Sequence, residues 1–413
     1  MISPVDLHTM ETLRRDAAEC LADWQLAQVR TLIPYLRANS RFYAKQLAGI
    51  DETGVDSQAA LARLPFTLPE EVRAAPEAFL CVAARDVRRV ATVTTSGSTG
   101  DPKRFSFTAN DIERTVEFFA YGMRSLTGEG RHVAVMLSTT TEASVATLLA
   151  SALAKIGATA SLHGHPTDMA AAVAAASGAD CLVGMPHELL RLCRAAPHLR
   201  PESVLLTADY VSRSAVSAIE GTWRCKTYAH YGMTETGYGL AVQCFAGGSQ
   251  HLRHADVLVE IVGPDGTPLP PGEEGEVVVT TFAQVAMPLL RYRTGDIASL
   301  DASPCACGGT LPRLGRIGGR IGGGVELDDG AYITVEELDE TILAFDEVQD
   351  YRARVLRQAS SDILSLTIDS GERLERRGFE KKIREQLPTP RIDFAYAPLP
   401  PMAGGRKRRI EIL

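Results

Sequence analysis

The sequence has little that suits a membrane or a nucleic acid. No stretch of about 18 apolar residues occurs, and the opening residues from Met1 to His8 lack the basic start and apolar run of an export signal. The formal net charge of −8 disfavours a polyanionic partner. These absences argue against nucleic-acid and membrane partners and predict a cytoplasmic protein.

Charged residues are sparse and cysteines are few. Hydrophobic residues make up 45% of the 413 positions and charged residues only 23%, so the chain can bury a large core and should form more than one domain. Disulfides are disfavoured in a cytoplasmic chain. Most of the cysteines lie in apolar patterns and are interpreted as core residues, namely Cys20, Cys81, Cys181, Cys193 and Cys225.

Strand and helix patterns alternate in the middle of the chain. Residues 10–50 have helical spacing, and a proline-containing connector follows at 64–69. The predicted strands are 132–137, 158–162, 181–185 and 204–207, and the predicted helices are 142–156, 169–176, 187–195 and 212–220. Repeated βα units predict a mostly parallel sheet with helices on both faces, which binds ligands beyond the carboxyl ends of its strands. Asp209 and Tyr231 fall at such ends.

The last part of the chain has a different pattern. Hairpin strands are predicted at 257–262 and 276–281, and a run rich in glycine extends from Gly315 to Gly324. We place a domain boundary near Gly319, which predicts an N-terminal domain at 1–318 and a small α+β lid domain at 319–413. The glycine-rich boundary is either a flexible linker or a hinge on which the lid rotates.

A loop of hydroxyl and glycine residues from Thr94 to Gly100, followed by Lys103, has the composition of a triphosphate-binding loop. Glycines let successive backbone N–H groups turn inward, and the lysine adds positive charge. In a Walker loop the lysine directly follows the second glycine, whereas Asp101 and Pro102 intervene here. The alternative is an ordinary surface turn rich in glycine and serine.

Two later segments supply other groups that a nucleotide needs. The segment from Tyr231 to Glu235 offers an aromatic face, a tight turn, a hydroxyl and a carboxylate, and the segment from Arg291 to Asp296 places a carboxylate directly after a glycine turn. Either segment alone is typical of a structural turn.

In this order, the three segments resemble the adenylate-forming superfamily of acyl-CoA synthetases, adenylation domains and luciferases, and most nearly its phenylacetate–CoA ligase-like branch. The resemblance extends from Arg41-Phe42-Tyr43 and Leu64-Pro65-Phe66-Thr67 to the segment Gly315–Arg320. It implies an α/β fold: a large N-terminal domain of mostly parallel sheets flanked by helices, a β-rich subdomain, and a small C-terminal α+β lid. It also implies that ATP and Mg²⁺ activate a carboxylic acid as an acyl adenylate, which a thiol then attacks.

The resemblance also implies a role for each motif residue. The phosphates would be held by Thr95, Ser96, Gly97, Ser98, Thr99, Gly100 and Lys103. Tyr231 would lie against adenine, Thr234 would reach phosphate, and Glu235 would bind Mg²⁺. Asp296 would accept hydrogen bonds from ribose, and Arg316 would approach ribose or phosphate. The remaining nucleotide-binding candidates are Ala208, Asp209 and Tyr210 of the adenine loop, with His230, Gly232 and Met233; His230 can equally line the acyl pocket or cap a strand.

The family also uses a lysine of the small domain during adenylation. The usual Gly-Lys pair is absent here, because Arg406 follows Gly405 and Lys407 comes one place later. Arginine and lysine differ in reach and hydrogen-bond geometry, so both residues are retained as catalytic candidates. The alternative is a solvated basic tail.

A second set of residues has the composition of a zinc site. Cys305 and Cys307 are two apart and precede glycines, while Cys244 and His251 lie in a loop just after the adenine motif. Three sulfurs and one nitrogen would complete a tetrahedral structural site for Zn²⁺, with free thiols as the alternative. Four protein ligands leave no open position, so this metal would not be catalytic.

The predicted function is an ATP-dependent acyl- or aryl-CoA ligase acting on a small carboxylic acid, with coenzyme A as the acyl acceptor. Two alternatives stay open: an adenylation enzyme that loads a carrier protein, and a nucleotide-binding sensor that has lost catalysis. The altered tail motivates the second alternative. A homodimer is one option for the assembly state, which the sequence does not determine.

Overall fold

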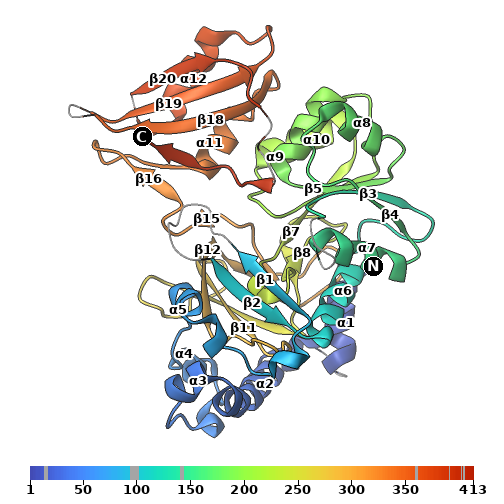
Figure 1. Ribbon diagram of the computed structural model, residues 1–413, viewed down its shortest axis with the longest axis vertical. Helices are drawn as coiled ribbons and strands as arrows, with labels where there is room; N and C mark the ends of the chain where they lie inside the picture. Colours follow the sequence, from blue (N-terminus) through green and yellow to red (C-terminus); the bar gives the residue numbers. More distant parts are fainter. Residues whose placement is uncertain are drawn as a thin grey trace. The chain divides into compact units, whose positions relative to one another are not determined.

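The computed structural model describes residues 1–13, 17–93, 102–139, 144–358, 361–389, 391–400, 402 and 405–413. The chain divides into two compact units (Figure 1). Unit 1 contains residues 1–128, 147–157 and 230–317, and unit 2 contains residues 129–146, 158–229 and 318–413. Among the described residues, no helix combines the length and apolar character needed to cross a bilayer.

Helices of unit 1 lie mainly in the first third of the chain. They are α1 (Pro4–Leu13), α2 (Ala17–Asn39), α3 (Arg41–Gln46), α4 (Gln58–Ala62), α5 (Pro69–Ala74), α6 (Ala109–Met123) and most of α7 (Val145–Lys155). Helix α6 shows why such segments are helical. Thr108 caps its first turn, Asp111 returns a bond to the cap, and its apolar face buries Phe118, Phe119 and Met123.

The strands of unit 1 are mostly antiparallel. Strands β10 (Val257–Val262), β11 (Gly275–Thr281) and β12 (Tyr292–Ala298) pair in sequence order, and β1 (Arg89–Val93) pairs with β2 (Lys103–Phe107). The shorter strands are β8 (Ala241–Val242), β9 (Gln250–Leu252), β13 (Leu300–Asp301) and β14 (Arg313–Leu314). Among these strands, the pair of β10 and β11 matches the hairpin that the sequence predicts at 257–262 and 276–281.

One detail of β12 corrects the sequence-based expectation. The segment before Asp296 was expected to be a glycine turn, but Asp296 lies inside the strand. The register between β11 and β12 shifts between Glu276 and Val278, and Gly295 opposite has a φ of +77°. Gly295 therefore belongs to an irregularity in the strand, where a backbone conformation that favours glycine re-aims the residues that follow.

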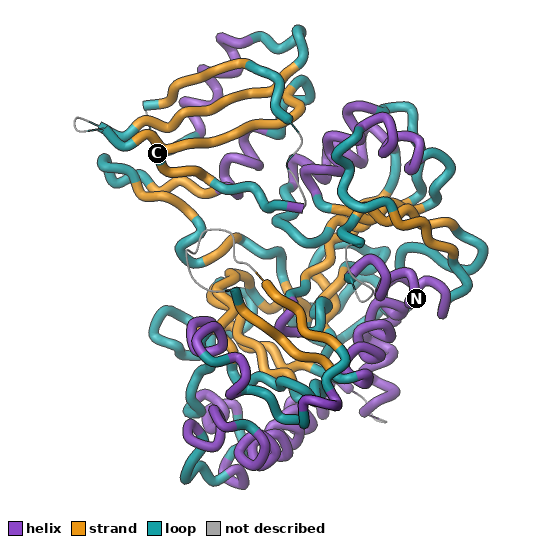
Figure 2. The backbone as a smooth tube through the Cα atoms, viewed as in Figure 1, coloured by secondary structure: helices purple, strands orange, loops and turns teal. Residues whose placement is uncertain are grey.

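Unit 2 begins with the alternating region. Strands β3 (His132–Met136), β4 (Thr159–Leu162), β5 (Cys181–Gly184), β6 (Ser203–Leu206) and the first residues of β7 (Lys226–Tyr231) pair in parallel in the order β4-β3-β5-β6-β7. The crossover helices are α8 (Met169–Ala176), α9 (Pro186–Ala195) and α10 (Arg213–Trp223). Figure 2 shows this alternation of strands and helices. The predicted parallel α/β pattern is confirmed.

The last segment of unit 2 is a small α+β region. Helices α11 (Val335–Ile342) and α12 (Arg376–Gln386) accompany the sheet of β20 (Ile392–Tyr396), β19 (Ile363–Ser370), β18 (Val348–Leu356) and β21 (Ile410–Ile412). The short strands are β15 (Gly319–Arg320), β16 (Gly324–Glu326) and β17 (Tyr332–Thr334). Its core is continuous with α9 and α10, since residues of both helices form one apolar cluster with residues of α11, α12, β18 and β19. The division at 318/319 into two domains stays a prediction.

A buried ion pair fixes the start of β12. The guanidinium of Arg291 donates to both carboxylate oxygens of Glu260 at 3.0 Å, and its Nη1 donates to the carbonyls of Ala62 and Leu64 at 2.7 Å. The Arg291 side chain is 0% exposed, and its guanidinium carbon lies 4.1 Å from the centre of the Phe66 ring. The proline-containing connector is therefore tied to the strand that carries Asp296.

Replacing Glu260 by glutamine should destabilise the protein by about 3 kcal/mol, because Arg291 would keep a buried charge without a carboxylate partner. Denaturant unfolding of Glu260→Gln measures this loss. The exposed Glu273→Gln makes the same chemical change on a neighbouring segment and should leave stability within about 0.5 kcal/mol. A loss for Glu260→Gln no larger than that of the control would contradict the assigned role.

Candidate functional site

The structure brings Lys103, Glu235 and Tyr292 together inside unit 1. Lys103 is the first residue of β2, Glu235 lies in the short 3₁₀ helix Thr234–Thr236, and Tyr292 opens β12. The ammonium of Lys103 forms an ion pair with Glu235 and donates to the Tyr292 hydroxyl at 3.0 Å. That hydroxyl in turn donates to Glu235 at 3.1 Å. The lysine and glutamate side chains are only 6% and 7% exposed, so each charge depends on the other.

The loop that carries Glu235 requires glycine at its start. A Cβ on Gly232 would lie 2.1 Å from the carbonyl oxygen of Tyr238, so a side chain cannot fit. The backbone N–H of Tyr238 donates to the carbonyl of Met233 at 2.8 Å, which closes the loop. The tight turn that the sequence predicts is therefore present, and it fixes the position of Thr234 and Glu235.

Tyr231 and Asp296, expected at adenine and ribose, are also joined within unit 1. Tyr231 ends β7, and its hydroxyl donates to Oδ2 of Asp296 at 2.7 Å. Both residues are largely buried, at 9% and 8% exposure. Since Tyr292 and Asp296 share β12, one strand supports both pairs of predicted nucleotide-site residues.

Most of the other predicted residues lie outside the described residues, near the end of unit 1, or in unit 2. The phosphate loop from Thr95 to Gly100 lies outside the described residues. Arg316 is exposed near the end of unit 1. Ala208, Asp209 and Tyr210, with Arg406 and Lys407, belong to unit 2.

The predicted adenine loop of unit 2 is strained and partly buried. Ala208 has a φ of +69°, a conformation that costs free energy for a residue with a Cβ. Oδ2 of Asp209 lies 3.8 Å from Nδ1 of His187. Burial raises the pKa of Asp209 to about 6, although the positive charge of Lys407 opposes that rise.

A glutamate of α11 reaches the residues that follow this loop. Tyr210 donates its hydroxyl proton to Glu340 at 3.0 Å, and the same carboxylate accepts from the backbone N–H groups of Arg213 and Ser214 at 3.0 and 3.1 Å. Glu340 therefore completes the first turn of α10, where Ser212 already caps Ala215.

The basic tail is not simply solvated, although Arg406 and Lys407 are exposed. The next residue, Arg408, is 6% exposed and forms ion pairs with Asp339 and with Asp350 at 2.6 Å. Its guanidinium lies 4.2 Å from the centre of the Tyr351 ring. Arg408 was missed at the sequence level because four consecutive basic residues, Arg406 to Arg409, give no signal of which one turns inward.

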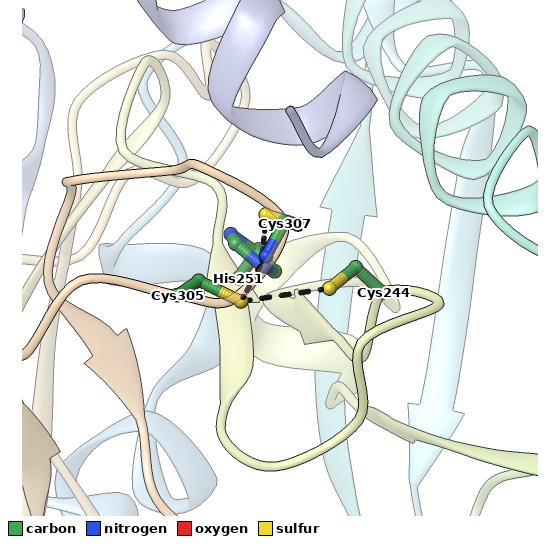
Figure 3. A group of neighbouring side chains, drawn as sticks. All are labelled: Cys244, His251, Cys305 and Cys307. Carbon is green, nitrogen blue, oxygen red and sulfur yellow. Dashed lines mark hydrogen bonds between the residues drawn. The ribbon is translucent and has the colours of Figure 1, made fainter. Parts of the chain in front are cut away.

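The predicted zinc ligands converge in unit 1 (Figure 3). Ligand atoms of Cys244, His251, Cys305 and Cys307 all lie within 4.8 Å of one another, and all four residues are buried. Sγ of Cys244 is 3.7 Å from Sγ of Cys305, and Sγ of Cys307 is 3.7 Å from Nε2 of His251. A tetrahedral zinc ion with ordinary bond lengths separates such ligand atoms by about 3.5–3.8 Å. The donor set and its spacing fit the metal.

Backbone groups around this cluster favour thiolates. The N–H groups of Ala246, Cys307 and Gly309 point at the sulfurs of Cys244, Cys305 and Cys307 at 3.4, 3.5 and 3.4 Å. Burial opposes ionisation of Cys244, but hydrogen bonds from His251 and Ala246 outweigh it and lower the pKa of the thiol to about 7. A thiol that ionises readily is a better metal ligand.

Known proteins resemble the chain over most of its length. A family model described as AMP-binding enzyme matches residues 39–287. The phenylacetate-coenzyme A ligase of Thermus thermophilus is 30% identical over 404 residues, covering 88% of this chain and 84% of that protein. The Escherichia coli phenylacetate-coenzyme A ligase is 26% identical over 396 residues, covering 90% and 87%. A solved 2-hydroxyisobutyryl-CoA ligase in complex with 2-HIB-AMP has a TM-score of 0.82 at 18% identity, covering 93% and 88%.

The family match and the curated relatives together define an AMP-forming, adenylate-forming enzyme. The chain belongs to the AMP-binding enzyme family. Within that family it lies in the phenylacetate–CoA ligase-like branch of acid–thiol ligases, as the sequence motifs indicated.

The environment of His230 generates a pH prediction. Its ring lies 6.3 and 6.0 Å from the rings of Phe118 and Phe119, and burial lowers its pKa to about 4. The unfolded chain binds this proton near pH 6.5 while the folded chain does not, so acidification favours unfolding. Stability that His230 contributes at pH 7 should fall by about 1.4 kcal/mol per pH unit between those two pKa values.

This effect is measured as the free energy of unfolding of wild type and His230→Phe at pH 7 and pH 5. The variant should lose less stability on acidification than wild type, whereas the exposed His163→Phe should behave as wild type. An equal loss in all three proteins would show that His230 is not held neutral.

Proposed function

We propose that this protein uses ATP to activate an aryl or medium-sized apolar carboxylic acid and then transfers the acyl group to coenzyme A. The observation that carries the proposal is the buried Lys103–Glu235–Tyr292 group beside the Tyr231–Asp296 pair in unit 1. Membership of the phenylacetate–CoA ligase-like branch supports the same reaction.

The reaction has two displacement steps. A carboxylate oxygen of the acid attacks the α-phosphorus of ATP, and the bond to pyrophosphate breaks. The thiol of coenzyme A then attacks the activated carbonyl, AMP leaves, and the thiol proton passes to solvent. No covalent bond to the enzyme is needed, so the protein contributes binding, orientation and charge compensation.

The residues of the sequence motifs would supply these contributions. Lys103 would exchange Glu235 for a phosphate oxygen, and Tyr292 would keep the two side chains aligned because it bonds to both. Tyr231 and Asp296 would orient adenine and ribose, with Ala208–Tyr210 as the adenine loop. Thr234, Arg316 and residues 95–100 would contact phosphate. Mg²⁺ held by Glu235 would neutralise charge that develops on the phosphates.

Exchange of partners explains why a buried ion pair suits this site. A lysine and a carboxylate at 6% and 7% exposure would each be costly alone, and their pairing keeps both in place before substrates arrive. An incoming phosphate and its cation bring the same two charges. The site can therefore accept them without leaving either side chain unpaired.

Pyrophosphate release with a panel of carboxylic acids tests the function, followed by thioester formation with coenzyme A or with a carrier protein. Turnover with an aryl or apolar acid and free coenzyme A is expected. Turnover only with a carrier protein would assign the loading reaction instead. Binding of ATP without pyrophosphate release from any acid would assign a sensor.

Glu235→Gln should lower the adenylation rate by about a hundredfold, which corresponds to about 2.7 kcal/mol of transition-state stabilisation. The variant should still fold, as circular dichroism can check, although it should melt at a lower temperature because Lys103 loses its carboxylate partner. The exposed Glu274→Gln is the matched control and should keep wild-type pyrophosphate release. Near-normal release by Glu235→Gln would remove this residue from the site.

The tail residue that acts in adenylation is proposed to be Arg406 or Lys407, since both are exposed while Arg408 is held by acidic partners. Arg406→Ala and Lys407→Ala are compared in two assays, acid plus ATP and preformed acyl adenylate plus coenzyme A. The acting residue should impair the first assay more. Unchanged activity of both variants would exclude the tail from catalysis.

We further propose that Cys244, His251, Cys305 and Cys307 hold one structural Zn²⁺. Purified protein should carry about one zinc per chain, and Cys305→Ser should lower both metal content and melting temperature because bound metal contributes to folding free energy. Cys193→Ser, which changes a buried cysteine of unit 2, should keep the metal. Elemental analysis and thermal melting measure both effects; a metal-free protein of unaltered stability would overturn the assignment.

A further inference from the structure

One acidic residue of the N-terminal helix faces the proposed zinc ligands from outside. Asp6 lies in α1, and its Oδ1 is 2.9 Å from Nδ1 of His251. The two side chains are 1% and 0% exposed. On the opposite edge of the same ring, Nε2 of His251 points toward Sγ of Cys307 at 3.7 Å. The imidazole therefore lies between a carboxylate and the three sulfurs.

The close approach of Asp6 to the cysteine loop depends on a glycine at position 309. A Cβ on Gly309 would lie 2.3 Å from Oδ2 of Asp6, so the carboxylate occupies the space that any other residue would fill. The N–H of Gly309 also points at Sγ of Cys307 at 3.4 Å. The loop that follows the two cysteines thus contacts the helix and a zinc ligand through the same glycine.

The burial of the Asp6 carboxylate beside His251 requires an explanation. Burying Asp6 costs free energy unless its charge is compensated, and an uncharged residue of similar size would avoid that cost. A histidine that binds metal through one ring nitrogen commonly donates the proton on the other to a carboxylate. The 2.9 Å separation of Oδ1 of Asp6 and Nδ1 of His251 places the two groups close enough to form such a pair.

We propose that Asp6 is a positioning residue of the zinc centre: it holds the His251 proton on Nδ1, so that the Nε2 lone pair faces the metal, and thereby fastens the N-terminal helix to the centre. The proposal rests on the zinc site proposed above. The proposed fastening of the helix follows from the length of α1. Helix α1 has 10 residues, too few to be stable alone, and depends on tertiary contacts.

Competition with a chromophoric chelator at fixed pH measures the zinc affinity of wild type, Asp6→Asn and Glu11→Gln. Asp6→Asn keeps the shape but removes the carboxylate, and zinc should bind about 10–100-fold more weakly. Glu11 lies exposed on the same helix, so its identical chemical change should leave affinity unchanged. The competition is run where all zinc-stripped proteins stay folded, because unfolding of the stripped protein would also lower the apparent affinity.

Amide hydrogen exchange supplies a second measurement that does not depend on a variant. Zinc-loaded and zinc-stripped wild type are compared, and residues 4–13 should exchange faster after the metal is removed. Unchanged exchange in this helix would overturn the fastening role, even if Asp6→Asn fails to fold.

The outcomes distinguish this inference from the zinc site itself. Wild type that binds no zinc would overturn both proposals. Zinc-containing wild type with an Asp6→Asn variant of equal affinity would overturn only the role of Asp6. Weaker binding by Asp6→Asn, together with faster exchange of the stripped helix, would establish the role.

Discussion

Compensation of buried charge is the constraint on which unit 1 depends. Lys103 with Glu235, and Arg291 with Glu260, place four charged side chains in positions at most 7% exposed. Each pair joins segments far apart in the chain, so neither can form until the fold brings them together. Both pairs also position β12, because Arg291 directly precedes this strand and Tyr292 is its first residue. The strand that carries Asp296 is therefore held by electrostatics as well as by its hydrogen-bond ladder.

This arrangement relates stability to function. The charged groups of the proposed nucleotide site are unfavourable in a core, and the protein keeps them by giving each a partner of opposite charge. The cost of assembling the site is then met during folding rather than when substrate arrives, which is the physical meaning of a preorganised site.

Much of the fold could be predicted from the sequence, because local periodicity determines it. The strands and helices between residues 132 and 223 follow regular apolar spacing, and the structure places them within a few residues of the predicted limits. The motif residues Tyr231, Glu235 and Asp296 could be named because each lies in a recognisable segment. The partners of those residues could not. Tyr292 lies inside the segment from Arg291 to Asp296, but no sequence pattern shows that its hydroxyl bonds to both Lys103 and Glu235.

Asp6 and Arg408 were missed for the same physical reason. Each acts on residues distant in sequence, and the signal that marks it is burial of a charge, which appears only in three dimensions. The irregularity at Gly295 is a related case: glycine before a carboxylate suggests a turn, whereas the pairing of β11 with β12 keeps the segment in a strand. The proposed ligands Cys244, His251, Cys305 and Cys307 were easier to find, because cysteine spacing is itself a signal.

The bonds of Glu340 to the start of α10 have a consequence for biosynthesis. A ribosome makes α10 well before it makes Glu340, so the nascent helix first has the Ser212 cap without the bonds from Glu340 to its leading N–H groups. The carboxylate that completes this turn arrives with the last segment of the chain. The first turn of α10 therefore gains its last hydrogen bonds only after α11 has been synthesised. A product truncated before Glu340 would leave this turn frayed.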